Sequence, residues 1–298
     1  MTHVSGVAPT RLSTGRRVAT WLHAHSRARL ALLLTLPILW LVVAYLGSLF
    51  VLLLNSLWSR DAFTGLVSRT LTLDNFVDII TKPLYRTVAL RTIGMAALVT
   101  ATCAILAFPI SYFMARVAGP RMRGLLIVAV LMPLWASYLI KAYSWRLILS
   151  EEGVLNWLLR PLGLHGPGLT EVGLWLVFTY LWLPYMILPL YAGFERIPSS
   201  VLEASADLGG RSWMTFRRVI LPLVVPALAA GSIFTFSLTL GDYIAPGLIT
   251  KTQFIGNVIY LNFGAPDLPF AAALSIGPLL VVVIYLLLAR RLGAFESL

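Results

Sequence analysis

Residues 196–222 read RIPSSVLEASADLGGRSWMTFRRVILP and lie between two long apolar runs. Pro198 and the two serines after it are typical of a helix start. Gly209 and Gly210 predict the end of that helix, because glycine takes a positive φ without strain. Ser212 is placed to cap the helix that follows. The stretch therefore predicts a short helix, a glycine turn and a second helix, which together form a rigid projection between two hydrophobic segments.

Uncharged segments long enough to cross a bilayer recur along the chain. A helix needs about 20 apolar residues to cross a hydrocarbon core of about 30 Å. The segments that reach this length are 30–59, 92–115, 124–149, 172–194, 219–241 and 268–289, the third of which is uncharged only as far as Lys141. They lack the alternation of an outer-membrane β-barrel. We therefore predict an all-α integral membrane protein with six transmembrane helices.

Two further segments are predicted to lie outside these spans. The uncharged segment 252–266 is short and contains glycine, asparagine and proline, so we expect a loop or a re-entrant segment there. Between the first two spans, residues 74–84 have an amphipathic pattern that predicts a short surface helix, capped by Asp74 or Asn75. Neither segment adds a transmembrane helix to the six.

The composition excludes most soluble classes of protein. Of the 298 residues, 59% are hydrophobic and only 12% are charged, and the mean hydropathy is +0.86. An ordinary soluble protein has about 25% charged residues. The one cysteine, Cys103, rules out an intrachain disulfide, and the four histidines are scattered without ligand spacing. We therefore expect no metal site and no cofactor bound by this chain.

The net charge of +11 is interpreted as a topology signal rather than as a sign of nucleic-acid binding. With six spans both termini share one side, which would hold 14 basic and four acidic residues, a net charge of +10. The other side would hold nine basic and eight acidic residues. Because cytoplasmic loops are enriched in lysine and arginine, we expect both termini in the cytoplasm. Residues 1–28 are predicted to be a largely disordered basic tail, and residues 29–298 the membrane domain.

The stretch between the fourth and fifth spans resembles the EAA loop of the permeases of ABC importers. That loop has the pattern E-A-A, three residues, G, nine residues, I-x-L-P. The pattern is matched, with serine for the second alanine and valine for isoleucine, by Glu203-Ala204-Ser205, Gly209, Val219 and Leu221-Pro222. Residues 195–218 are called the EAA loop below.

The resemblance implies a type I importer permease fold and a cytoplasmic loop that docks on an ATPase subunit. It gives the docking and coupling role to Glu203, Ala204, Ser205, Asp207, Gly209 and Arg211. The chain has no phosphate-binding loop of the form G-x-x-x-x-G-K-[ST], so ATP and magnesium are expected on a separate ATPase dimer. A second, homologous permease subunit and a periplasmic solute-binding protein complete the implied importer, in the inner membrane of a bacterium.

Other segments resemble the spermidine/putrescine branch of this family. They are Ser137–Trp145, Glu152–Asn156 and Phe254–Asn257, whereas Thr72–Phe76 resembles the outer segment of the permease family as a whole. The resemblance implies that the cargo is a polyamine or a similar small cationic solute. Iron, phosphonates and opines are the alternatives within the family, and a permease subunit is not expected to be an enzyme.

Polar and aromatic residues in three predicted spans are candidates for the translocation path. Thr235, Thr239 and Asp242 recur at helical spacing and share one face. A carboxylate at the membrane edge needs water, a partner or a ligand, and aromatic faces attract ammonium groups. The candidate set is Trp135, Tyr138, Tyr185, Thr235, Thr239, Asp242 and Tyr243. The alternatives are interhelical hydrogen bonds for the hydroxyls and an interfacial belt for the rings.

Two other functions compete with this hypothesis. An ion-coupled transporter that works without ATP needs ionisable groups deep in several spans, and the sequence has almost none there. A membrane enzyme needs a catalytic constellation near a span end, and the sequence offers none.

Lys141 conflicts with a cation path, because an unpaired lysine would repel a polyamine. Pairing of Lys141 with Glu151 or Glu152 would remove this conflict.

Overall fold

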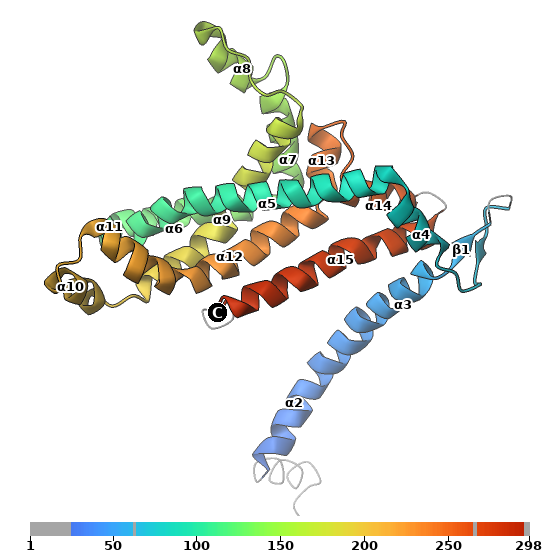
Figure 1. Ribbon diagram of the computed structural model, residues 1–298, viewed down its shortest axis with the longest axis horizontal. Coiled ribbons are helices and arrows are strands. Elements are labelled where there is room, and N and C mark those ends of the chain that lie inside the picture. Colours follow the sequence, from blue (N-terminus) through green and yellow to red (C-terminus); the bar gives the residue numbers. More distant parts are fainter. Residues whose placement is uncertain (1–24, 62–63, 265–266, 295–298) are drawn as a thin grey trace, which may run out of the picture. The chain divides into compact units, whose positions relative to one another are not determined.

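The computed structural model describes residues 25–61, 64–264 and 267–294 (Figure 1). Within these ranges the chain is mostly helical, and a two-stranded hairpin is the only sheet. The chain divides into two units, residues 1–54 and residues 55–298. Among the described residues, five helices are long and apolar enough to cross a membrane, and a bent helix pair makes a sixth crossing if it counts as one span. This agrees with the predicted all-α membrane fold.

The described part of the first unit is one continuous helix. It consists of α2 (Ser26–Trp40), a π-helical segment over Leu41–Leu46 and most of α3 (Gly47–Ser56). Pro37 lies just before the wider π-helical turns, as expected where a proline removes a backbone hydrogen bond. Of the predicted disordered tail, residues 1–24 lie outside the described residues, and α2 already includes the last three.

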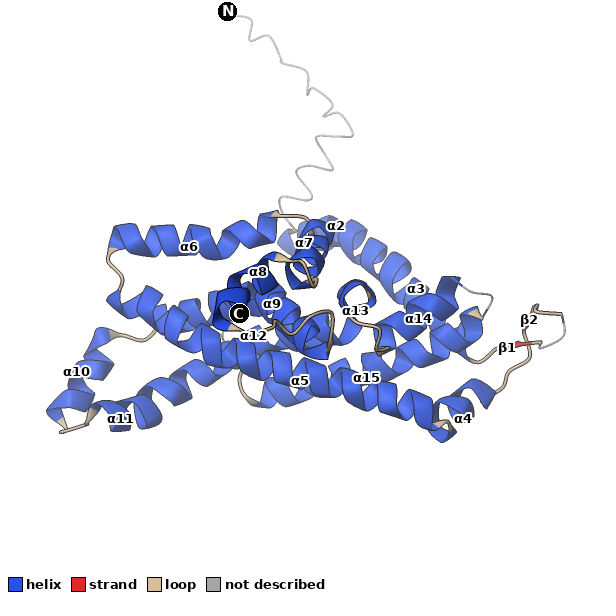
Figure 2. Ribbon diagram, turned by 90° about the horizontal axis from the view of Figure 1, so that it is seen from above, coloured by secondary structure: helices blue, strands red, loops and turns tan. Residues whose placement is uncertain are grey.

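Three helices form the core of the second unit. They are α5 (Pro83–Tyr112), α9 (Glu171–Glu195) and α12 (Leu221–Gly241), which pack against one another (Figures 1 and 2). α9 is the most buried of the candidate spans. α15 (Leu268–Arg291) packs against α12. The second span thus begins at Pro83, earlier than the predicted residue 92, because Arg86 and Arg91, which interrupt the uncharged run, lie within one unbroken helix.

Small residues bring α9 and α12 close together. A β-carbon added to Gly193 would lie 2.5 Å from Cβ of Ala227. One added to Gly231 would lie 2.9 Å from Sδ of Met186 and 3.2 Å from its Cα. In lipid, where apolar burial between helices gains little, such close van der Waals packing is a main source of helix association. Gly193 and Gly231 therefore permit the close contact between α9 and α12 because they have no side chain.

The predicted span 124–149 is not one straight helix. It is divided into α6 (Pro120–Trp135) and α7 (Tyr138–Leu149), which meet at an angle of 94°. Ala136 and Ser137 have extended backbone angles at the break. Lys141 donates a hydrogen bond from Nζ to the carbonyl oxygen of Pro133, 3.0 Å away. Lys141 thus satisfies a carbonyl freed at the end of α6, and it forms no ion pair with Glu151 or Glu152.

α7 is followed by α8 (Val154–Leu159) and a 3₁₀ turn over Arg160–Leu162. The predicted loop or re-entrant segment 252–266 contains a helix, α14 (Ile255–Gly264), preceded by α13 (Ile244–Ile249). With 10 residues, α14 is too short to cross a bilayer. The segment is thus helical rather than a loop, and it adds no span.

The segment between the first two spans contains a strand pair and the predicted surface helix. Strands β1 (Ser59–Arg60) and β2 (Val67–Ser68) are antiparallel, and α4 (Asp74–Thr81) follows them. The predicted cap is wrong: Leu73 occupies the N-cap position, and its side chain makes no cap bond. Asn75 instead donates to the carbonyl oxygens of Ser56 and Trp58, at 3.3 and 2.8 Å. This amide holds the hairpin region against α4.

Replacing Gly231 with valine should destabilise the bundle by about 1–3 kcal/mol, because the added carbons overlap Met186. The measurement is thermal unfolding of the purified chain in detergent. Gly277→Val on α15 is the matched control, since a β-carbon there meets nothing within 4 Å. Equal melting temperatures for the two variants would contradict the packing described here.

Candidate functional site

The EAA loop folds as two short helices around a glycine turn. The first, α10, covers Ser199–Asp207, and the second, α11, covers Ser212–Thr215 and continues as a π-helical segment over Phe216–Ile220. Gly209 has a φ of +75°. Its N–H donates to the carbonyl oxygen of Ala206, and the N–H of Gly210 donates to that of Ser205. This pair of bonds is a Schellman motif, which confirms the predicted role of the glycine turn.

A side-chain hydrogen bond joins the two helices of the loop. Ser205 Oγ lies 2.8 Å from Oγ1 of Thr215. Gly210 permits this approach, because a β-carbon there would lie 2.6 Å from the carbonyl oxygen of Ser205. Serine in place of the second alanine of the EAA pattern therefore has a structural role. The predicted cap by Ser212 is wrong: Arg211 occupies the N-cap position, and no side chain caps α11.

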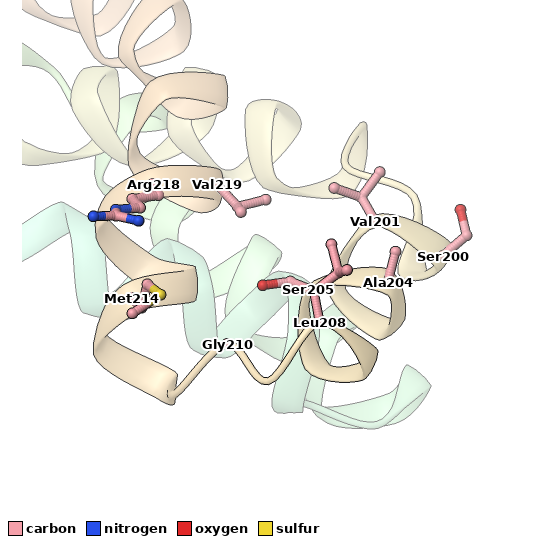
Figure 3. A pocket seen from close by; sticks show the side chains of 9 residues that line it. All are labelled: Ser200, Val201, Ala204, Ser205, Leu208, Gly210, Met214, Arg218 and Val219. Carbon is pink, nitrogen blue, oxygen red and sulfur yellow. The ribbon is translucent and has the colours of Figure 1, made fainter.

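A groove of about 450 Å³ lies between α10 and the helix that follows the turn (Figure 3). Residues of α10, including Ala204 and Ser205, line one side, and Met214, Arg218 and Val219 line the other. The lining residues are Ser200, Val201, Ala204, Ser205, Leu208, Gly210, Met214, Arg218 and Val219. Of the predicted docking residues, Ala204 and Ser205 therefore line a preformed concave surface.

The exposed part of the loop combines apolar and acidic side chains. Leu208 is 89% exposed and Trp213 is 69% exposed. Glu203 and Asp207 are exposed as well, and neither forms an ion pair with another described residue. Large exposed apolar side chains next to unpaired charges are typical of a surface that binds a partner. The tip of the EAA loop therefore has the chemistry of a docking surface.

Asp242 occupies a second candidate site, one residue after α12 ends. The hydroxyl of Tyr138 on α7 donates a hydrogen bond to Oδ2 of Asp242. Oδ1 accepts from the backbone N–H groups of Ile244 and Ala245, at 2.8 and 3.1 Å. Burial raises the pKa of the carboxyl above its ordinary value, although these hydrogen bonds oppose the shift. Asp242 forms no ion pair with another described residue.

A row of aromatic rings leads away from Asp242 across three helices. The ring of Tyr138 stacks on Trp182 of α9 at 6.0 Å, and Trp182 lies 5.9 Å from Tyr185. Tyr185 stacks on Phe234 of α12 at 6.3 Å. Trp182 is 7% exposed, and its Nε1 has no hydrogen-bond partner. The structure thus places predicted residues Tyr138, Tyr185 and Asp242 around one row, which Trp182 and Phe234 complete.

The other predicted path residues lie outside this row. Thr235 and Thr239 are buried, and their hydroxyls bond to carbonyl oxygens of their own helix. Trp135, at the end of α6, is 83% exposed. Tyr243 stacks on Tyr260 of α14, with ring centroids 4.6 Å apart. Thr235 Oγ1 also lies 3.4 Å from Oγ1 of Thr100 on α5, which fits the interhelical hydrogen bond that was the alternative for this hydroxyl.

The chain was compared with known proteins. The model of the family described as "Binding-protein-dependent transport system inner membrane component" matches residues 12–295. The inner membrane ABC transporter permease protein YdcU of Escherichia coli (strain K12) is 46% identical over 286 residues, which cover 90% of this chain and 91% of the relative. The spermidine/putrescine transport system permease protein PotB of the same strain is 33% identical over 264 residues, which cover 85% and 93%.

A solved structure shares the fold. The crystal structure of a bacterial alginate ABC transporter, in complex with an alginate pentasaccharide-bound periplasmic protein, contains a chain that superposes with a TM-score of 0.73. The two sequences are 18% identical, and the match covers 93% of this chain and 98% of the other. The shared fold therefore extends over nearly the whole length of both chains.

Substituting alanine for Gly210 should loosen the EAA loop, because the new methyl group would push Ser205 and Thr215 apart. We expect a cost of about 1–3 kcal/mol, seen as faster hydrogen exchange over residues 199–215. Gly119→Ala serves as the control, because a β-carbon there has open space. Unchanged exchange in the Gly210 variant would show that the glycine is not needed for the turn.

Proposed function

Because the chain belongs to the family of binding-protein-dependent transport system inner membrane components, we propose that it forms the translocation path for a polyamine, driven by ATP hydrolysis in a partner. The family assignment makes it a multi-pass inner membrane protein and the permease subunit of an ATP-binding cassette importer. Its fold is that of a type I importer permease. The similarity to spermidine/putrescine permeases over 85% of the chain is the observation that carries the choice of cargo.

The EAA loop is the docking element for a cytoplasmic ATPase dimer. A stiff loop transmits force better than a mobile one, and three hydrogen bonds stiffen this loop: two in the glycine turn and one between Ser205 and Thr215. The exposed side chains of Glu203, Asp207 and Leu208 supply charge and apolar area to the contact. ATP and magnesium are bound by the ATPase, and both termini of the permease face the cytoplasm.

The remaining partners are those that the family assignment implies. A second, homologous permease subunit completes the wall of the path, and a periplasmic solute-binding protein delivers the cargo. The carboxylate of Asp242 and the aromatic row next to it then meet the incoming solute. A polyamine is a flexible chain of ammonium groups, which a carboxylate attracts directly and aromatic faces attract by about 0.5–2 kcal/mol each.

The hydrogen bond from Tyr138 to Asp242 is expected to break when the solute arrives. It occupies Oδ2 of Asp242 when no cation is present, so that the carboxylate is not left unpaired at the membrane edge. An ammonium group that approaches Asp242 competes for this oxygen. Release of Tyr138 would then free α7 from the turn between α12 and α13, and thereby link arrival of the solute to movement of a helix.

The substitution Glu203→Arg should abolish ATP-driven spermidine uptake by the assembled importer, because it reverses a charge in the docking surface. Insertion and folding should be unchanged, since Glu203 is exposed and forms no ion pair with another described residue. The measurement is uptake into cells, together with co-purification of the ATPase. Glu151→Arg, at an exposed glutamate outside the loop, is the control. Full uptake by the Glu203 variant would refute the docking assignment.

The isosteric change Asp242→Asn should raise the KM for spermidine about tenfold, equivalent to about 1.4 kcal/mol, because it removes the charge. Asparagine retains a carbonyl oxygen for the N–H groups of Ile244 and Ala245, so the turn is preserved. The measurement is the concentration dependence of uptake by the intact importer. Asp74→Asn, at an exposed carboxylate on α4 that forms no ion pair with another described residue, should leave the KM unchanged. An unaltered KM for the Asp242 variant would place this carboxylate outside the path.

A further inference from the structure

An arginine joins the base of the EAA loop to α5. Arg116 lies in the π-helical segment Phe113–Val117 that continues α5. Its Nη2 donates to the carbonyl oxygen of Phe194, 2.5 Å away, and to that of Ile197. Phe194 belongs to the last turn of α9, and Ile197 precedes α10 by two residues. The carbonyls at the end of a helix carry the negative end of the helix dipole, so a cation there is held by both oxygens and by the dipole.

A second arginine extends this attachment to α6. Arg123, near the start of α6, donates from Nε to the carbonyl oxygen of Met114 and from Nη2 to that of Ala115, at 3.2 and 3.0 Å. Its Nη1 lies 3.3 Å from Oε1 of Glu195, the last residue of α9. Glu195 also accepts from the hydroxyl of Tyr191, at 2.5 Å. Arg116, Arg123 and Glu195 are called the arginine clamp below.

The far end of the EAA loop meets α5 as well. Phe216, which follows α11, contacts Phe108 of α5 edge to face, with ring centroids 5.4 Å apart. Phe108 in turn contacts Phe194 at 5.1 Å. Trp213 stacks on Phe216 and continues this aromatic cluster toward the exposed surface. The chain therefore attaches to α5 where it enters the loop and again where it leaves.

The other end of α5 contacts the segments around Asp242. With 30 residues, α5 extends over about 45 Å. Near its start, Thr92 accepts a hydrogen bond from the N–H of Ile255, at 3.0 Å, and Arg91 donates to the carbonyl oxygen of Gln253. Gly256 follows, and a β-carbon on it would lie 2.5 Å from the carbonyl oxygen of Asp242. One helix thus contacts both candidate sites, directly at the EAA loop and through α14 at Asp242.

We propose that Arg116 and Arg123 are positioning residues that make the EAA loop and α5 move as one body, so that α5 carries the movement of the loop to the Asp242 end of the bundle. Ring contacts between Phe108 and Phe216 can slide, whereas a guanidinium that donates to two fixed carbonyls resists both translation and rotation. The proposal rests on the proposed docking of an ATPase on the loop. It assigns the transmission of force to residues outside the docking surface.

The test measures whether the loop and α5 keep their spacing when ATP binds. Spin labels are placed by Ser199→Cys on α10, outside the groove, and by Leu106→Cys on α5; both positions are exposed, while the native Cys103 is fully buried. The full chain is assembled with its ATPase and the second permease in nanodiscs, without solute. We expect one constant distance in the nucleotide-free and ATP-bound states. In Arg116→Met, the distance should shift by about 2 Å or more on ATP binding, the scale of helix displacements in allosteric proteins.

Two variants separate positioning from a loss of structure. Arg116→Lys should restore the constant distance, because an ammonium group can donate to the same carbonyls. Arg121→Met is the matched control: Arg121 lies beside the clamp, is exposed and forms no ion pair among the described residues. If Arg116→Met does not assemble, Glu195→Gln tests the clamp, and we expect a similar shift from loss of the ion pair to Arg123.

A constant distance in Arg116→Met would overturn the proposal, and so would a constant distance in Glu195→Gln where that variant takes its place. A shift in Arg121→Met equal to that in Arg116→Met would also overturn it, since the effect would then not belong to the clamp. Failure of the ATPase to bind the wild-type chain is a different result. It would overturn the docking on which the proposal rests, that is, the proposed function itself.

Discussion

Close packing of α9 against α12 is the contact on which the rest of the structure depends. α9 leads into the EAA loop and α12 follows it, so this contact fixes the distance between the two ends of the loop. Gly193 and Ala227 make the approach tight close to the loop, and Gly231 does so further along. In a bilayer, packing of this kind replaces the hydrophobic driving force that holds a soluble core together. A loop with fixed ends can act as a lever, whereas a loop on loosely packed helices would absorb the movement.

Features that depend on local sequence could be predicted well. Runs of uncharged residues predicted the transmembrane helices, because a backbone in lipid has to satisfy its hydrogen bonds within a helix. Pro198 and Gly209 correctly predicted where α10 begins and ends. Proline fixes the backbone angle φ at a helix start, and glycine allows the positive φ that ends a helix. Asp242 and Tyr138 were both candidates for the path. Their hydrogen bond could not be predicted, since 104 residues separate them and only the packing of α7 near the end of α12 brings them together.

Features that depend on distant or competing partners could not be derived from the local sequence. Lys141 has acidic neighbours in sequence, yet it donates to the carbonyl of Pro133, because the 94° break between α6 and α7 leaves that oxygen without a helical partner. Asn75 has the chemistry of a helix cap but serves the carbonyls of Ser56 and Trp58 instead. Arg116 directly follows the predicted span 92–115, and its sequence position indicates only a positive charge at a span end. Its bonds to Phe194 and Ile197 follow from the packing of α5 against α9.

On this account the chain provides the path for the solute but not the energy for transport. That energy comes from ATP hydrolysis in a partner and reaches the chain through the EAA loop. The most direct measurement compares spermidine accumulation in proteoliposomes that contain this chain alone with accumulation in proteoliposomes that contain the complete importer. We expect accumulation against a gradient only with the ATPase, the second permease, the solute-binding protein and ATP all present. Accumulation by the chain alone, driven by an ion gradient, would contradict the account.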